Sequence, residues 1–178
     1  MPFREENSHW AQEILTLRLG FLKLGPDVKN LELNFTQLTT VFLNHNKFAN
    51  VDDDAFALCQ NLKFLAIQDN QISQWFDLSY LSKLEFVDLC NNKIDHHKVE
   101  CLPECLLVLK LQGNPLCQAS DASAHRWSYR KVYVEALANL DQIDKVEVLQ
   151  AERLSYKGLL PRMNLKTLLQ DQETKVMQ

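Results

Sequence analysis

Four side chains of types that bind zinc lie within ten residues of this sequence: His96, His97, Cys101 and Cys105. Imidazole nitrogens and thiolates are preferred ligands of Zn²⁺, so a tetrahedral metal site is the chemistry that these residue types offer. Their order, H-H-x-x-x-C-x-x-x-C, does not match an established zinc pattern. Packed thiols and solvated histidines are therefore expected here, with no metal and no cofactor.

A second candidate for chemistry is the pair His45 and Asp69, which hold equivalent places 24 residues apart. An imidazole beside a carboxylate can act as acid and base, but no nucleophile accompanies this pair. The sequence also contains no G-x-S-x-G, no phosphate-binding loop and no H-E-x-x-H motif. We expect a solvated polar pair in a protein that is not an enzyme.

The element that positions these residues is a repeat. Its frame is Leu-x-x-Leu-x-Leu-x-x-Asn-x-Leu with apolar substitutes, and its asparagines are 24, 22 and 22 residues apart: Asn46, Asn70, Asn92 and Asn114. This frame is the leucine-rich-repeat signature. Each such repeat has one strand and one return segment and buries its apolar face only against its neighbours. The pattern predicts an α/β solenoid with a short parallel sheet on its concave face and helical caps at both ends.

The four asparagines are expected to be structural. Each one lies where a coil leaves its strand, and a side-chain amide there can bond backbone groups that the turn leaves unpaired. They form a ladder that defines which strand residues point inward and which point outward. The ladder is therefore part of the scaffold and not a binding site.

The repeats divide the chain into four parts. Residues 1–37 are predicted to be an N-terminal cap with a degenerate repeat in which Leu22 takes the asparagine place, preceded by a helix that begins after Ser8. Residues 38–117 hold the full repeats, and 118–144 hold a polar loop and a capping helix. Residues 145–178 are predicted to be an amphipathic helical tail, with one helix to Tyr156 or Lys157 and a second from Pro161. Trp127, after the polar loop, either packs on the cap or anchors a ligand.

The end of the repeat region carries a family resemblance. Asn114-Pro115, Tyr129-Arg130 and the closing Ile143-Asp144 resemble the C-terminal cap of the leucine-rich-repeat subfamily with 22-residue repeats. That subfamily includes a protein phosphatase 1 regulatory subunit, the axonemal outer-arm dynein light chain and the spliceosomal A-prime protein. The stretch LEFVDLCNNKIDHHKVECLPECLLVLKLQGNPL is most similar to a group of ciliary and flagellar repeat proteins. The resemblance spans residues 38–144 and implies an adaptor without catalysis of its own.

Composition restricts the compartment and the partners. No run of 18 apolar residues exists and the N-terminus is polar, so no membrane association is expected. Five cysteines without a C-x-x-C pair suit the reducing cytoplasm. The net charge is −4, and residues 1–144 hold 13 basic and 19 acidic residues, which makes nucleic acid an unlikely partner. A cytoplasmic protein is expected, and the resemblance implies a cilium or flagellum.

The concave face is where a partner is expected to bind. If the frame residues point into the core, the alternate strand residues point outward, and three phenylalanines are then exposed. Phe64 and Phe86 should be direct neighbours, with Val108 extending the row and Phe42 diagonally beside it. Polar residues are expected to surround this row: Asn44, Gln68, Asp69, Asp88 and Lys110. An apolar centre with a polar rim is typical of a protein interface.

These observations favour an adaptor that is monomeric alone and binds another protein, either a helix or a small domain, in the concave groove. A ciliary or flagellar assembly is the setting that the resemblance favours. Regulation of a protein phosphatase and a spliceosomal or nuclear scaffold are the alternatives. A further alternative is that the N-terminal arm or the C-terminal tail folds back and covers the rings itself.

Overall fold

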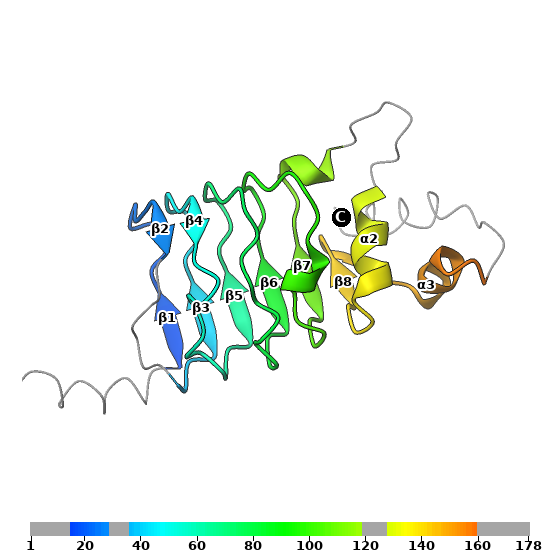
Figure 1. The fold of residues 1–178 in the computed structure, drawn as a ribbon, viewed down its shortest axis with the longest axis horizontal. Coiled ribbons are helices and arrows are strands. Elements are labelled where there is room, and N and C mark those ends of the chain that lie inside the picture. Colours follow the sequence, from blue (N-terminus) through cyan, green and yellow to red (C-terminus); the bar gives the residue numbers. More distant parts are fainter. Residues whose placement is uncertain (1–14, 29–35, 119–127, 160–178) are drawn as a thin grey trace, which may run out of the picture.

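Parallel strands at a regular interval form the body of the molecule. The structure is a computed structural model that describes residues 15–28, 36–118 and 128–159. One strand comes from each repeat, in chain order (Figure 1): β1 (Thr16–Arg18), β3 (Thr40–Phe42), β5 (Phe64–Ala66), β6 (Phe86–Asp88) and β7 (Val108–Lys110). All of them pair in parallel, and β8 (Gln142–Ile143) extends the sheet on the far side of β7. The predicted leucine-rich-repeat solenoid with a parallel sheet is confirmed.

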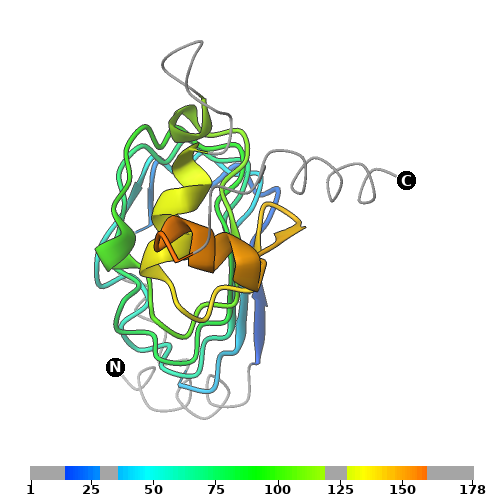
Figure 2. The same ribbon diagram turned by 90° about the vertical axis from the view of Figure 1, so that its right-hand side faces the viewer.

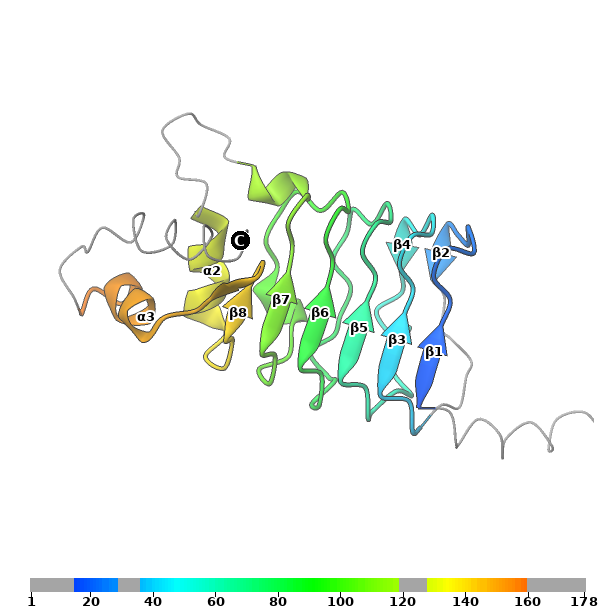
Figure 3. The ribbon, with the colours of Figure 1, turned by 180° about the vertical axis from the view of Figure 1, so that it is seen from behind.

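The return segments on the opposite side contain little regular structure. Strands β2 (Asp27–Val28) and β4 (Asn50–Val51) pair in a second, two-stranded sheet. Later coils have only the short 3₁₀ helices η1 (Val99–Cys101) and η2 (Pro115–Cys117). Figure 3 shows the strands from behind, and Figure 2 looks along the solenoid and shows successive coils nearly superimposed.

The asparagine ladder makes the hydrogen bonds expected of it. The Asn92 side-chain amide nitrogen donates to the Ile67 and Leu89 carbonyls, both at 3.1 Å, and its oxygen accepts the Ile72 backbone N–H at 3.0 Å. The other three asparagines repeat this pattern, and all four are buried. Each amide therefore links the backbone of its own coil to the backbone of the coil before it.

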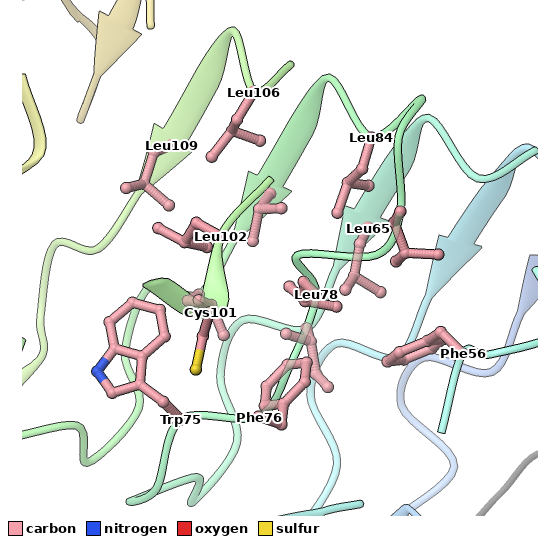
Figure 4. Close-up of a cluster of buried hydrophobic side chains, with 14 of the residues drawn as sticks. Phe56, Leu65, Trp75, Phe76, Leu78, Leu84, Cys101, Leu102, Leu106 and Leu109 are labelled. Carbon is pink, nitrogen blue, oxygen red and sulfur yellow. The ribbon is translucent and has the colours of Figure 1, made fainter. Parts of the chain in front are cut away.

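Leucines of the frame fill the core between sheet and return segments (Figure 4). Aromatic residues of the second and third coils complete it, and Trp75 is packed inward as expected, with its indole N–H donating to the His96 carbonyl at 2.8 Å. In the coil after β6, His97 and Glu100 stand where apolar residues are usual. Cys101 and Leu102 turn inward there instead and are 4% exposed each, so the core stays continuous.

A cap closes the C-terminal end of the core. Helix α2 (Ser128–Ala136) places Tyr133 over the last coil, and β9 (Val146–Glu147) folds back antiparallel on β8. Helix α3 (Gln150–Tyr156) then packs on α2 (Figure 2). It ends as predicted, near Gly158, whose φ is 70°. The expected division at residue 144 falls in the β8–β9 turn, so residues 145–158 pack as part of the cap.

A buried ion pair joins the two cap helices. The Arg130 guanidinium and the Glu152 carboxylate are both fully buried, and they form a two-point contact with N–O distances of 2.7 and 3.0 Å. The remaining Arg130 N–H groups donate to the carbonyls of Ile143, Val146 and Glu147. Arg153 of α3 donates to carbonyls at the end of α2, including that of Val134. The sequence pattern does not predict this network.

Several sequence predictions concern segments outside the described residues: the helix after Ser8, Trp127, and the second tail helix from Pro161. The degenerate first repeat does supply β1, which pairs with β3 in register. Leu22, in the asparagine place, is 55% exposed. Asn46 of the next coil bonds this first coil as the other ladder asparagines bond theirs, by accepting from the Leu24 N–H. Within residues 15–28, 36–118 and 128–159, no helix has the length and apolarity needed to cross a bilayer.

A column of left-handed residues runs along the sheet edge beside the asparagines. The residue before each ladder asparagine has a positive φ: His45 at 55°, Asp69 at 58° and Asn91 at 53°. Gly113 holds this place in the last coil, with φ at 85°. A Cβ on Gly113 would lie 2.1 Å from the Asn91 side-chain oxygen and 3.1 Å from its backbone nitrogen. The lack of space therefore requires a glycine here, whereas His45, Asp69 and Asn91 show that the left-handed conformation alone does not.

Replacing Gly113 with alanine should lower the free energy of unfolding by about 1–2 kcal/mol, because the new methyl group clashes with Asn91 and disfavours the left-handed backbone. Urea unfolding followed by circular dichroism measures the change. In an Asn91→Gly background the clash is gone, so the same substitution should cost less. An equal cost in both backgrounds would mean that the Asn91 side chain is not the obstacle.

Candidate interaction face

The strands bring the expected aromatic row together on the outer side of the sheet, called here the sheet face. Phe64 is the register partner of Phe86, and Phe86 that of Val108. The Phe64 and Phe86 rings stack with centroids 4.1 Å apart and planes within 6°, while Phe42 lies diagonally, 5.3 Å from Phe64. The neighbour relations predicted from the repeat register are confirmed.

The rings are partly buried, although the repeat register predicted that they would be exposed. Each ring covers part of the next, because register neighbours on adjacent strands lie only about 4.8 Å apart. Ala66, which follows Phe64 by two residues on the same strand, is 3% exposed. The row is thus a continuous apolar surface with one side in solvent.

A cation lies at each end of the row. The Arg18 guanidinium lies 4.2 Å from the Phe42 ring centroid, and the Lys110 ammonium lies 4.9 Å from that of Phe86. Arg18 was not predicted as part of this face, because it lies outside the full repeats. The sequence does contain a signal for Arg18, because Arg18 follows Leu17 in the degenerate frame as Phe42 follows Val41. Arg18 and Phe42 are register partners.

Asp88 departs from its expected place on the polar rim. It is 8% exposed and accepts hydrogen bonds from Lys110 at 3.1 Å and from the Cys90 backbone N–H at 3.1 Å. Its register partners on the two neighbouring strands are Ala66 and Lys110. Asp88 therefore fixes Lys110 and is not itself a surface charge.

The polar residues that flank the row form two further columns. Asn44 and Gln68 are partly exposed, and within the described part of the chain the Gln68 side-chain oxygen is buried without a hydrogen-bond partner. The His45 Nε2 lies 3.2 Å from the Asp69 carboxylate, which also accepts from Asn91 at 2.8 Å. Phe21 stacks on the His45 ring with centroids 4.2 Å apart. Asp69 is thus held between the equivalent residues of the two neighbouring coils, beside the row.

The four possible zinc ligands are not brought together. His96 pairs with Asp95 at 2.7 Å, and the His97 Nδ1 faces the Tyr133 hydroxyl at 3.2 Å. Cys101 is buried, and the Cys105 thiol lies 3.3 Å from the Leu84 carbonyl. Over the described ranges, no three His, Cys, Asp or Glu side chains cluster closely enough to hold a metal ion.

The thiols are protonated because they are packed. Burial raises the pKa of Cys59 to about 11, and burial together with the Asp144 charge raises that of Cys117 to about 12. Burial raises the pKa of Cys101 as well. A thiol with a raised pKa is a poor nucleophile at neutral pH. All five cysteines are free.

Residues 36–94, at the centre of the sheet face, match the family described as Leucine rich repeat. These residues are therefore leucine-rich repeats, and the described part of the chain has the leucine-rich-repeat solenoid fold. The chain resembles geranylgeranyl transferase type-2 subunit alpha of Bos taurus, with 34% identity over 129 residues, which cover 69% of this chain and 22% of that subunit. The chain thus matches about a fifth of the length of that curated relative.

One solved structure gives the same fold. The functional domain of InlJ from Listeria monocytogenes superposes with a TM-score of 0.52 and 23% identity, over 80% of this chain and 28% of that one. The Drosophila melanogaster SNF/U2A' complex contains a chain with a TM-score of 0.49 and 19% identity, over 96% of this chain and 82% of that one. The first likeness shows the leucine-rich-repeat fold and nothing more specific.

Proposed function

We propose that the chain is a non-enzymatic adaptor that binds another protein through the sheet face. The observation that carries this proposal is the stacked row of Phe42, Phe64 and Phe86, an apolar strip with one side in solvent. Solenoid repeats use such extended faces for binding. Aromatic side chains at the centre of a polar rim are the usual anchors of protein interfaces.

A partner-binding assay tests the row. In the Phe64→Asp, Phe86→Asp double variant, we expect the affinity for a co-purifying partner to fall at least tenfold, because two aromatic anchors are replaced by charges that resist desolvation. The side chains lie outside the core, so circular dichroism should report an intact fold. Surface plasmon resonance with the purified partner measures the change.

Leu58→Asp is the matched control. It is also an apolar-to-acid change, but Leu58 is 43% exposed on a return segment away from the sheet face. Its affinity should stay within twofold of the parent chain. A double variant that is folded and binds as tightly as the parent would exclude the sheet face as the site.

The alternative is that the chain's own C-terminal tail covers the rings, whereas the adaptor proposal predicts that the rings are free to bind a partner. A chain that ends at Leu159 should bind its partner and a hydrophobic dye as the full chain does. An increase in dye binding on truncation would indicate that the row is covered within the molecule.

A ciliary or flagellar assembly is the setting that we favour, on the resemblance to that group, which includes leucine-rich repeat-containing protein 46. The likeness to a transferase alpha subunit supports a second candidate function, an accessory subunit of an enzyme assembly. A regulatory subunit of a protein phosphatase is one case of this function. Co-purification separates the two: axonemal or tubulin-associated partners favour the first, and an enzyme subunit favours the second. A spliceosomal scaffold predicts nuclear location and an RNA-binding co-partner.

A further inference from the structure

We infer that the sheet face takes an amphipathic helix that crosses the strands and carries an acidic side chain at its β1 end, where Arg18 binds the carboxylate. This inference rests on the proposed function, because it names the partner for the same face. It concerns the form of the partner and its orientation.

The surroundings of Arg18 suit the binding of a carboxylate. One side of its guanidinium lies on the Phe42 ring at 4.2 Å, which holds the planar group in a defined orientation. Among the described residues it has no hydrogen-bond acceptor and no acidic neighbour in an ion pair. Its N–H edge is the free fork that matches the two oxygens of a carboxylate.

The other end of the row is electrically neutral. Lys110 is bound to the buried Asp88 carboxylate at 3.1 Å, so its charge is already compensated. The two cations are therefore not equivalent. Of these two cations, Arg18 at the β1 end is the one that an acidic group of a partner can pair with. This difference determines which end of the partner lies over β1.

The backbone of the sheet excludes an extended partner across the row. The strand N–H and C=O groups are used within the parallel ladder, from β1 through β7. An extended segment lying across the strands would leave its own backbone groups unpaired, whereas a helix satisfies them internally.

The spacing of the strands also fits a helix. Adjacent strands lie about 4.8 Å apart and one helical turn advances about 5.4 Å, so a helix across the sheet presents roughly one side chain to each strand. An acidic residue at position i would meet Arg18. Apolar residues at i+3 or i+4, i+7, and i+10 or i+11 would then lie over Phe42, Phe64 and Phe86.

A displayed library of 18-residue helix-forming peptides, randomised on one face, tests the inference on the full chain. The parent chain should select apolar residues at these spacings with Asp or Glu one turn before the first of them. Changing that acid to its amide should weaken binding about tenfold to the parent chain and less than twofold to Arg18→Gln. Lys93→Gln, an equal loss of charge at an exposed turn, is the control and should behave as the parent.

The outcomes separate the two proposals. Selected helices without the acid, or an acid whose effect is unchanged in Arg18→Gln, would overturn the role of Arg18 and leave the adaptor proposal standing. If the parent chain selects no helices, the helical partner is wrong, and the protein partner assay above still decides the function. If peptides bind the Phe64→Asp, Phe86→Asp variant as tightly as the parent, both proposals fail.

Discussion

Replacing Glu152 with glutamine should lower the free energy of unfolding by about 3–5 kcal/mol, because it removes the carboxylate charge that lies against the buried Arg130 guanidinium. Both side chains are fully inaccessible to solvent, so water cannot compensate for the lost charge. The Tyr156 hydroxyl, which donates to Glu152 at 2.9 Å, loses a charged acceptor as well. Urea unfolding at neutral pH, followed by circular dichroism, measures the loss.

Glu135→Gln is the control for this change. Glu135 pairs with Lys131 at 3.8 Å on the exposed side of α2, and such a surface pair is worth less than about 0.5 kcal/mol. Replacing Arg130 and Glu152 together by methionine should recover only part of the stability, because the carbonyls of Ile143, Val146 and Glu147 lose their donor. A loss below about 1 kcal/mol for Glu152→Gln would show that the pair does not hold α3 in place.

Replacing Asn92 with alanine should cost about 3–4 kcal/mol, because three buried hydrogen bonds are lost at once and one buried backbone donor loses its acceptor. The Ile67 and Leu89 carbonyls keep the bonds from Asn70 and Asn114, whereas the Ile72 N–H would be left buried without the Asn92 oxygen. The damage spans two coils, so the unfolding transition should also become less cooperative. Thermal unfolding by calorimetry reports both the midpoint and the cooperativity.

Asn61→Ala provides the comparison. Asn61 also donates to a backbone carbonyl, that of Thr36 at 2.6 Å, but this contact is exposed and water can replace the donor. We expect it to cost less than about 1 kcal/mol. If Asn92→Ala and Asn61→Ala cost the same, the asparagine ladder contributes no more than an ordinary surface contact.

The repeat frame allowed the fold and the aromatic row to be predicted because register follows from period. Once Asn70 and Asn92 are aligned, the strand residues of neighbouring coils are aligned too, and Phe64 must lie beside Phe86. Burial depends on which side chains lean over which, and periodicity does not contain that information. Asp88 was therefore predicted on the rim, although it is buried and paired with Lys110.

The cap was predicted less completely, for a different reason. Outside the repeats, no period relates one residue to another. Arg130 and Glu152 are 22 residues apart in sequence and lie on two different helices. Neither residue stands out locally, since each lies on a helix with other charges. Arg18 was missed for a related reason, because its repeat is too degenerate to draw attention to its outward residue.

The ladder and the cap together give the molecule a direction. Each coil is bonded only to its immediate neighbours, so disorder has to spread one coil at a time from an end. The C-terminal end is locked by a buried charge pair, whereas at the other end the described part of β1 has a strand on one side only, and Leu15, Phe21 and Leu22 are more than half exposed. Of the two ends of the described sheet, β1 is the one where we expect fraying to start. A ligand bound to Arg18 would stabilise the β1 end of the sheet. Binding at the sheet face should therefore slow the unfolding of the coils.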